Sequence, residues 1–197
     1  MFFKESIMKK MIKSAYKVGG LIVAHTPKDG TEPEGLYLAT STWAAWMEYD
    51  KVPKGIKAAV VEMTGELPET GESYKAMPGM GNQVTMSDAT VLDLREIVDH
   101  ATERGRITKL VQTGPINTRY IEMENGDVLP ISEELIKVID KNATEKDESK
   151  PDGPCMKEDG CQMLWENERC IYLACMLADG SEGQKKFRES LREVGLP

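Results

Sequence analysis

Residues 106–131 read RITKLVQTGPINTRYIEMENGDVLPI, and this stretch decides the predicted fold. Segments 107–111 and 119–123 are rich in β-branched and aromatic residues, which favour strands. Asn125-Gly126 is the strongest short hairpin signal, because both central residues of such a turn need a positive φ. The stretch therefore predicts a three-stranded antiparallel meander.

The predicted turn also sets a register for the hairpin. With a two-residue loop, Met123 faces Val128 and Ile121 faces Pro130 on the neighbouring strand. Proline has no backbone N–H to donate, so the last strand of the meander is expected at the edge of the sheet.

Amphipathic helices are expected around this meander. The best defined covers residues 88–104, where the apolar side is formed by Val91, Leu94, Val98 and Ala101. The opposite side of this helix carries four carboxylates, Asp93, Glu96, Asp99 and Glu103. Apolar spacing also predicts helices at 3–15 and 53–64, one after Ser132, and a short one that carries Trp43, Trp46 and Met47.

Short strands are predicted at 18–24 and 36–39, and a long irregular loop at 68–86. The loop is rich in Gly and Pro, and loops of this length are often functional. Strands and helices do not alternate strictly, which favours an α+β protein. The expected architecture is a small antiparallel sheet, the meander around 106–131, with amphipathic helices packed on it.

The C-terminal part has a different pattern. Residues 142–154 are charged and lack apolar periodicity, which is typical of a flexible linker. Beyond them, helical spacing connects Cys170, Leu173, Ala174 and Leu177, and again Phe187, Leu191 and Val194. The sequence thus predicts an α+β domain at 1–141, a linker at 142–154 and a helical hairpin appendage at 155–197.

Charge is distributed unevenly along the chain. The 197 residues carry a formal charge of -8, which argues against direct nucleic-acid binding by the chain as a whole. Residues 1–17 contain five lysines and one glutamate, a net +4, which leaves -12 for the rest. The basic helix at 3–15 could bind nucleic acid or an anionic membrane surface, but docking of its apolar stripe on the acidic body is favoured.

No apolar run is long enough for a signal core or a membrane span, so a cytoplasmic protein without membrane association is expected. The four cysteines are Cys155, Cys161, Cys170 and Cys175, and their spacings suit zinc poorly. They are interpreted as small core residues and turn-flanking thiols. A zinc site and a disulfide remain alternatives.

Catalytic and cofactor signatures are weak. Only His25 and His100 could serve as imidazole bases, and neither lies in a recognisable motif. The loop segment 79–83 contains a G-x-G but lacks the third glycine and the strand-to-helix setting of a phosphate-binding loop. No cofactor and no metal ion is therefore predicted.

The absence of a catalytic signature and the acidity of the body favour a binding protein over an enzyme. The hypothesis is a non-enzymatic inhibitor or regulator, of the kind that phages and mobile elements encode against nucleic-acid-handling machinery. Its acidic surface would bind a protein partner with a basic surface. The residues predicted to bind this partner are Asp93, Glu96, Asp99, Glu103, Met80 and Asn82.

Three alternatives remain open. One is a small enzyme with a site near His25 and the 68–86 loop, and another is a structural or assembly subunit. The third is that the negative charge serves solubility alone.

Overall fold

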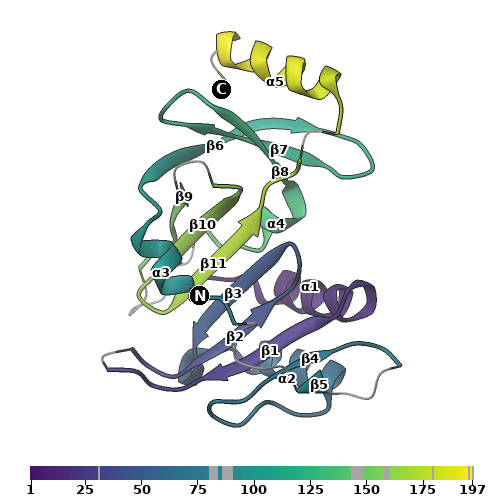
Figure 1. Cartoon of the computed structure of the whole chain (residues 1–197), viewed down its shortest axis with the longest axis vertical. Helices are drawn as coiled ribbons and strands as arrows, with labels where there is room; N and C mark the ends of the chain where they lie inside the picture. The colour runs from purple at the N-terminus through teal and green to yellow at the C-terminus, as the bar shows by residue number, and fades with distance from the viewer. Residues whose placement is uncertain are drawn as a thin grey trace.

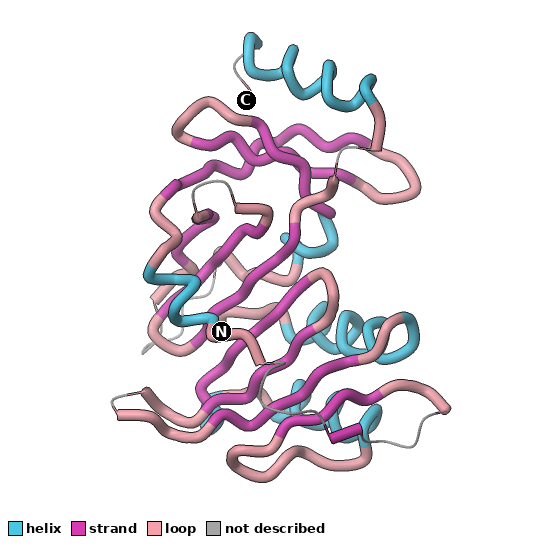
Figure 2. Tube along the Cα trace, in the orientation of Figure 1, coloured by secondary structure: helices cyan, strands magenta, loops and turns pink. Residues whose placement is uncertain are grey.

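The structure is a computed structural model that describes residues 1–30, 32–79, 84–85, 91–142, 149–157, 160–178, 180–194 and 196. Within these residues, eleven strands form one continuous antiparallel sheet in the order β5-β4-β1-β2-β3-β11-β10-β9-β6-β7-β8. Figure 1 shows how the two halves of the sheet follow one another along the long axis, and Figure 2 shows how little of the chain is helical.

The helices are α1 (Glu5–Val18), the 3-10 turn η1 (Tyr49–Lys51), α2 (Lys54–Thr64), α3 (Leu94–Asp99), α4 (Glu133–Lys137) and α5 (Glu182–Val194). The first strands are β1 (Leu21–Thr26), β2 (Gly35–Ala39), β3 (Trp43–Glu48), β4 (Ser73–Ala76) and β5 (Val84–Thr85). The later ones are β6 (Glu103–Gln112), β7 (Thr118–Met123), β8 (Val128–Ser132), β9 (Asp152–Met156), β10 (Gln162–Asn167) and β11 (Cys170–Cys175).

The predicted fold class is wrong in the size of its sheet. Helices and strands are both present, but the sheet is large rather than a small meander, and the described helices are few and mostly short. A main reason is the segment that carries Trp43, Trp46 and Met47, which is strand β3 and not a helix. Five of its six residues are buried, since both faces of the sheet are covered there, so its apolar run shows no strand alternation.

The predicted C-terminal helical hairpin is also wrong over its first part. Residues 170–175 form β11, which pairs with β10 on one side and with β3 on the other. The spacing of Cys170, Leu173 and Ala174 fits a helix, but β11 is buried on both faces and a short buried strand is apolar at every position. The final helix, α5, is present as predicted.

The predicted linker and acidic helix are both shorter than expected. Residues 143–148 of the linker lie outside the described residues, and β9 begins inside its predicted bounds at Asp152. The helix predicted at 88–104 is present only as α3, while residues 86–90 lie outside the described part. Glu103 is the first residue of β6 instead, where it pairs with Met156 of β9.

The meander is present as β6, β7 and β8, but its predicted hairpin register is wrong by one residue. Glu122 pairs with Val128 and Tyr120 with Pro130. The loop has three residues and ends on Gly126 at a φ of 86°, which is the common three-residue alternative to a two-residue turn. β8 is the last strand in the order, as predicted from Pro130.

Two apolar cores lie on opposite faces of the same sheet. Along β1, Leu21 and Val23 belong to the larger core, while Ile22 and Ala24 belong to the smaller one, because successive side chains point to opposite faces. Helices α1 and α2 cover the larger core, and α3 covers the smaller one.

The predicted docking of the N-terminal helix is observed. α1 buries Met8 and Ile12 in the larger core, so the apolar stripe is packed inside the protein while its lysines remain near the surface. Among the described residues, no helix is long and apolar enough to cross a membrane.

Candidate functional site

A groove of about 280 Å³ lies beside α3, on the face of the sheet opposite α1 and α2. Its described lining comes from four separate parts of the chain: the β1–β2 hairpin, strand β3, residues 91–95, and Ile171 of β11. The aromatic side chains of Tyr37 and Trp46 contribute to it, and Leu92 stands at its rim with 48% of its surface exposed. The groove thus combines an aromatic base with an open rim.

Trp46 is held in a fixed orientation by two neighbours. Its indole Nε1–H donates to the hydroxyl of Thr26 at 3.0 Å, and that hydroxyl donates to the Gly35 carbonyl oxygen at 3.2 Å. The indole also lies directly against Gly35, since a Cβ atom on that residue would lie 1.8 Å from the Trp46 Nε1 atom. Glycine at position 35 therefore makes room for the aromatic base of the groove.

Arg95 covers the exposed side of this base. Its guanidinium carbon lies 4.8 Å from the Trp46 ring centroid, a cation–π contact. The Arg95 Nε atom is 3.6 Å from a carboxylate oxygen of Glu32, which is too long for a hydrogen bond. The contacts show that a guanidinium fits between this indole and this carboxylate.

Tyr37 connects the base of the groove to the start of α3. The Leu92 backbone amide donates to the Tyr37 hydroxyl at 3.4 Å. Burial raises the pKa of the Tyr37 hydroxyl, so this group stays neutral at physiological pH. A neutral hydroxyl at this position accepts a hydrogen bond without adding charge to the groove.

Carboxylates dominate the charge of the lining among the described residues. Asp29, Glu32 and Asp93 line the groove there, against the one cation of Arg95. Asp93 is also the N-cap of α3, because its side chain accepts a hydrogen bond from the Glu96 backbone amide at 3.0 Å. The lining therefore has a net negative charge.

More carboxylates continue from the groove toward β9 and β10. Burial raises the pKa of Glu166 on β10, and the nearby charges of Asp152 and Asp99 raise it further, while Arg95 opposes the shift. Like-charged carboxylates close enough to affect one another's protonation create a local negative field. Arg104 neutralises part of this charge, because its guanidinium pairs with both carboxylate oxygens of Asp152 at 2.9 Å.

The groove places carboxylates beside aromatic and apolar side chains. A cationic side chain could pair with Glu32 or Asp93 while its apolar neighbours contact Trp46, Tyr37 and Leu92. Among the described residues, the polar non-aromatic lining of the groove consists of Thr26, the three carboxylates and Arg95.

The structure brings together only some of the predicted binding residues. Asp93, Glu96 and Asp99 lie along α3 and are exposed, whereas Glu103 lies in β6 and is partly buried. Met80 and Asn82 lie outside the described residues, so their predicted role is not addressed. Sequence analysis missed Trp46, Glu32 and Arg95, and no local signal reveals them, since they meet only through the sheet.

The alternative site near His25 and the 68–86 loop is described only in part, because residues 80–83 and 86 lie outside the described residues. The His25 side chain is 7% exposed, and its Nε2 atom lies 3.3 Å from a carboxylate oxygen of Glu34. The imidazole stacks on the Tyr49 ring with 3.8 Å between centroids. Within the described residues, His25 is not part of the lining of the groove or of three further clefts, and backbone hydrogen bonds join it to Gly71 and Glu72.

The other titratable candidates have structural roles as well. His100 follows α3, and its Nδ1 atom donates to the Glu96 carbonyl oxygen at 2.6 Å. All four cysteines lie in described segments and are free thiols. Within those segments, no group of three or more histidine, cysteine or acidic side chains is arranged to hold a metal ion.

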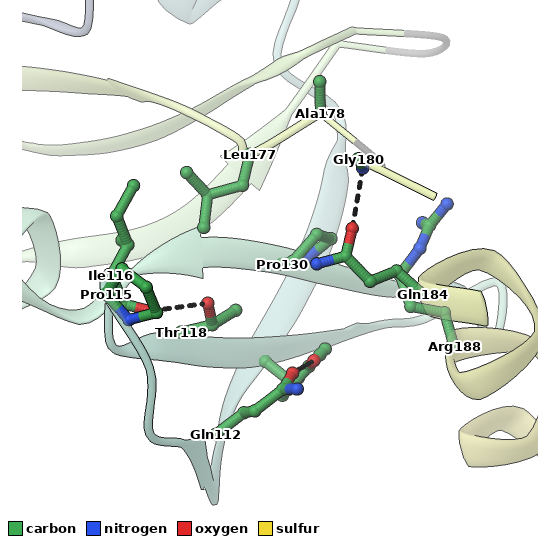
Figure 3. A pocket seen from close by; sticks show the side chains of 11 residues that line it. Gln112, Pro115, Ile116, Thr118, Pro130, Leu177, Ala178, Gly180, Gln184 and Arg188 are labelled. Carbon is green, nitrogen blue, oxygen red and sulfur yellow. Dashed lines mark hydrogen bonds between the residues drawn. The ribbon is translucent and has the colours of Figure 1, made fainter. Parts of the chain in front are cut away.

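A second cleft, also of about 280 Å³, lies between the meander and α5 (Figure 3). Its walls are largely apolar, with Ile116, Pro130 and Leu177 among them. The Gln184 side chain reaches across one end and accepts a hydrogen bond from the Gly180 amide at 2.7 Å. The polar groups drawn in this cleft are used in contacts within the chain, so the groove beside α3 is the stronger candidate.

The chain matches no protein-family model, no curated protein and no solved structure.

Proposed function

We propose that this chain is a non-enzymatic protein-binding module whose acidic groove beside α3 binds a basic segment of a protein partner. The observation that carries the proposal is the placement of Arg95 on Trp46 and near Glu32. The contact is an intramolecular example of the chemistry that a partner's arginine would use.

The negative lining supports a cationic ligand. Asp29, Glu32 and Asp93 outnumber the one arginine in the groove, and Glu96 and Asp99 extend the same sign of charge along α3. Such a surface accelerates the encounter with a basic partner and disfavours acidic ones. The exposed Leu92 and the aromatic base supply apolar contact area beside the charges.

The test uses a fluorescein-labelled peptide of alternating arginine and leucine, titrated with the protein and followed by fluorescence anisotropy. The triple variant Asp29→Asn/Glu32→Gln/Asp93→Asn removes the rim charges. Asparagine at position 93 keeps a side-chain oxygen for the α3 cap. We expect the variant to bind on the order of 10- to 100-fold more weakly, because each charge contributes about 0.5–1 kcal/mol at a partly exposed site.

The matched control is Glu182→Gln/Glu189→Gln/Glu193→Gln on α5, which makes the same change in net charge at exposed sites away from the groove. It should bind like the unmodified chain. Equal weakening by both triple variants would mean that only overall charge matters, and the groove would then have no specific role. Absence of peptide binding at low salt would contradict the proposal directly.

A further inference from the structure

The second charged surface of the molecule is formed by α1 and α2. The two helices pack against each other on the same core and run in the same direction, since their first turns meet and their later turns meet as well. At their first turns, Gly55 lies against the Glu5 carboxylate, and further along, the Lys13 Nζ atom is 2.7 Å from Glu62. Together they form one helical layer on the face of the sheet opposite the acidic groove.

This layer concentrates the lysines of the chain. The two helices contain six lysines and two glutamates, a net +4, which leaves -12 for the remainder of a chain of charge -8. Sequence analysis credited the first helix alone with this basic character. The fold places Lys54 and Lys57 of α2 beside it, so the basic surface is larger than the sequence predicts.

Several of these lysines are already used within the chain. Lys13 pairs with Glu62, and the Lys9 Nζ atom lies 3.7 Å from Glu5. The Lys57 Nζ atom stands 3.7 Å from the centroid of the Tyr49 ring. By contrast, Lys10, Lys17 and Lys54 are exposed and form no ion pair with any described residue.

The spacing of the unpaired lysines suits an extended polyanion. Lys10 and Lys17 are seven residues apart, so they share one side of α1 at a separation of about 10 Å. Packed helices lie about 8–10 Å apart, which puts Lys54 on a neighbouring row. The lysines form a broad array of point charges without arginine forks, the pattern expected for contacts to a phosphate backbone rather than to base edges.

From this geometry we infer that the α1–α2 layer binds the phosphate backbone of nucleic acid without sequence specificity. An anionic membrane fits less well, because Met8 and Ile12, the apolar side that an interfacial helix would insert, are buried in the core. The chain would then bind a basic protein on one face and nucleic acid on the other.

The experiment measures anisotropy of fluorescein-labelled duplex DNA and single-stranded RNA, titrated with the full chain at several salt concentrations. The variant is Lys10→Gln/Lys17→Gln/Lys54→Gln, which leaves the observed Lys9 and Lys13 ion pairs in place. We expect it to bind at least tenfold more weakly than the unmodified chain. Its plot of log affinity against log salt should be shallower by about 3, one unit for each lost phosphate contact.

The matched control is Lys109→Gln/Lys185→Gln/Lys186→Gln, which removes three exposed lysines from β6 and α5. It should retain the affinity and the salt slope. No binding of either nucleic acid at low salt, or equal losses in both variants, would overturn the inference. Binding to phosphatidylserine vesicles without binding to either nucleic acid would also overturn it, because the layer would then bind lipid. Low-salt dimers that both the lysine variant and the acidic-groove variant abolish would overturn it as well, because the layer would then bind a second copy of the chain.

The inference and the proposed function fail separately. The lysine variant leaves the groove intact, and the groove variant leaves the lysines intact. Peptide binding without nucleic-acid binding would therefore remove only this inference.

Discussion

Gly35 lies where a larger residue cannot fit without moving Trp46. The indole occupies the space that a Cβ atom would need, and its Nε1–H depends on this position for the hydrogen bond to Thr26. A single residue on β2 thus determines whether the Trp46 ring can occupy the base of the groove. Glycine is required here because the indole approaches the backbone closely, and not because of an unusual φ at this position.

We expect Gly35→Ala to lower the free energy of unfolding by about 1–3 kcal/mol, because the indole must shift and its hydrogen bond to Thr26 weakens. Urea unfolding followed by circular dichroism measures the change. The same variant should weaken binding of the arginine–leucine peptide.

Gly19→Ala is the matched control, since a Cβ atom on this residue would have no atom within 4 Å and the φ here is -139°. It should change stability by no more than about 0.5 kcal/mol. A Gly35→Ala chain as stable as this control would show that Trp46 does not rest on Gly35.

Only part of the candidate site could be predicted at this scale. Asp93, Glu96 and Asp99 follow from the polar side of a periodic segment, because helical spacing is a local property. Trp46 and Glu32 reach the same groove only through strand pairing between β1, β2 and β3. Such contacts depend on distant parts of the chain and leave no local pattern.

Helix α5 is attached to the rest of the molecule by few contacts. Leu191 is its one buried residue among those described, whereas α1, of nearly the same length, buries Met8 and Ile12. The remaining ties of α5 are peripheral, such as the ion pair at 2.8 Å between Arg192 and Asp127. It forms one wall of the cleft in Figure 3.

We expect the backbone amides of α5 to exchange hydrogen on the order of 100-fold faster than those of α1, because little apolar burial opposes local unfolding. Hydrogen exchange followed by mass spectrometry makes the comparison within one sample, with α1 as the internal control. Equal protection of the two helices would show that α5 is integrated into the fold more firmly than its burial indicates.

The elements that sequence analysis assigned correctly are those with polar and apolar sides. α2 and α5 are amphipathic over three turns, and the meander is bounded by strong turn residues. β3 and β11 are short and buried on both faces, so every position is apolar and the helical and strand patterns cannot be distinguished. These two wrong assignments fall at the junction where β3 pairs with β11.

For the whole molecule, the sheet separates two charged surfaces. The lysines of α1 and α2 lie over one face, and the acidic groove beside α3 lies over the other. The net charge of -8 does not reveal these two surfaces, because it indicates only that the chain as a whole is acidic. The pairing of β3 with β11 could not be predicted, because it joins segments more than 120 residues apart.

The most direct test of the proposed function is a chemical-shift titration of the ¹⁵N-labelled chain with the arginine–leucine peptide. The proposal predicts saturable shifts of the Trp46 indole Nε1–H signal and of the amides from Leu92 to Asp99, while the amides of α1 and α2 stay unchanged. Shifts confined to other surfaces, or no shifts at all, would contradict the assignment of the groove beside α3 as the binding site.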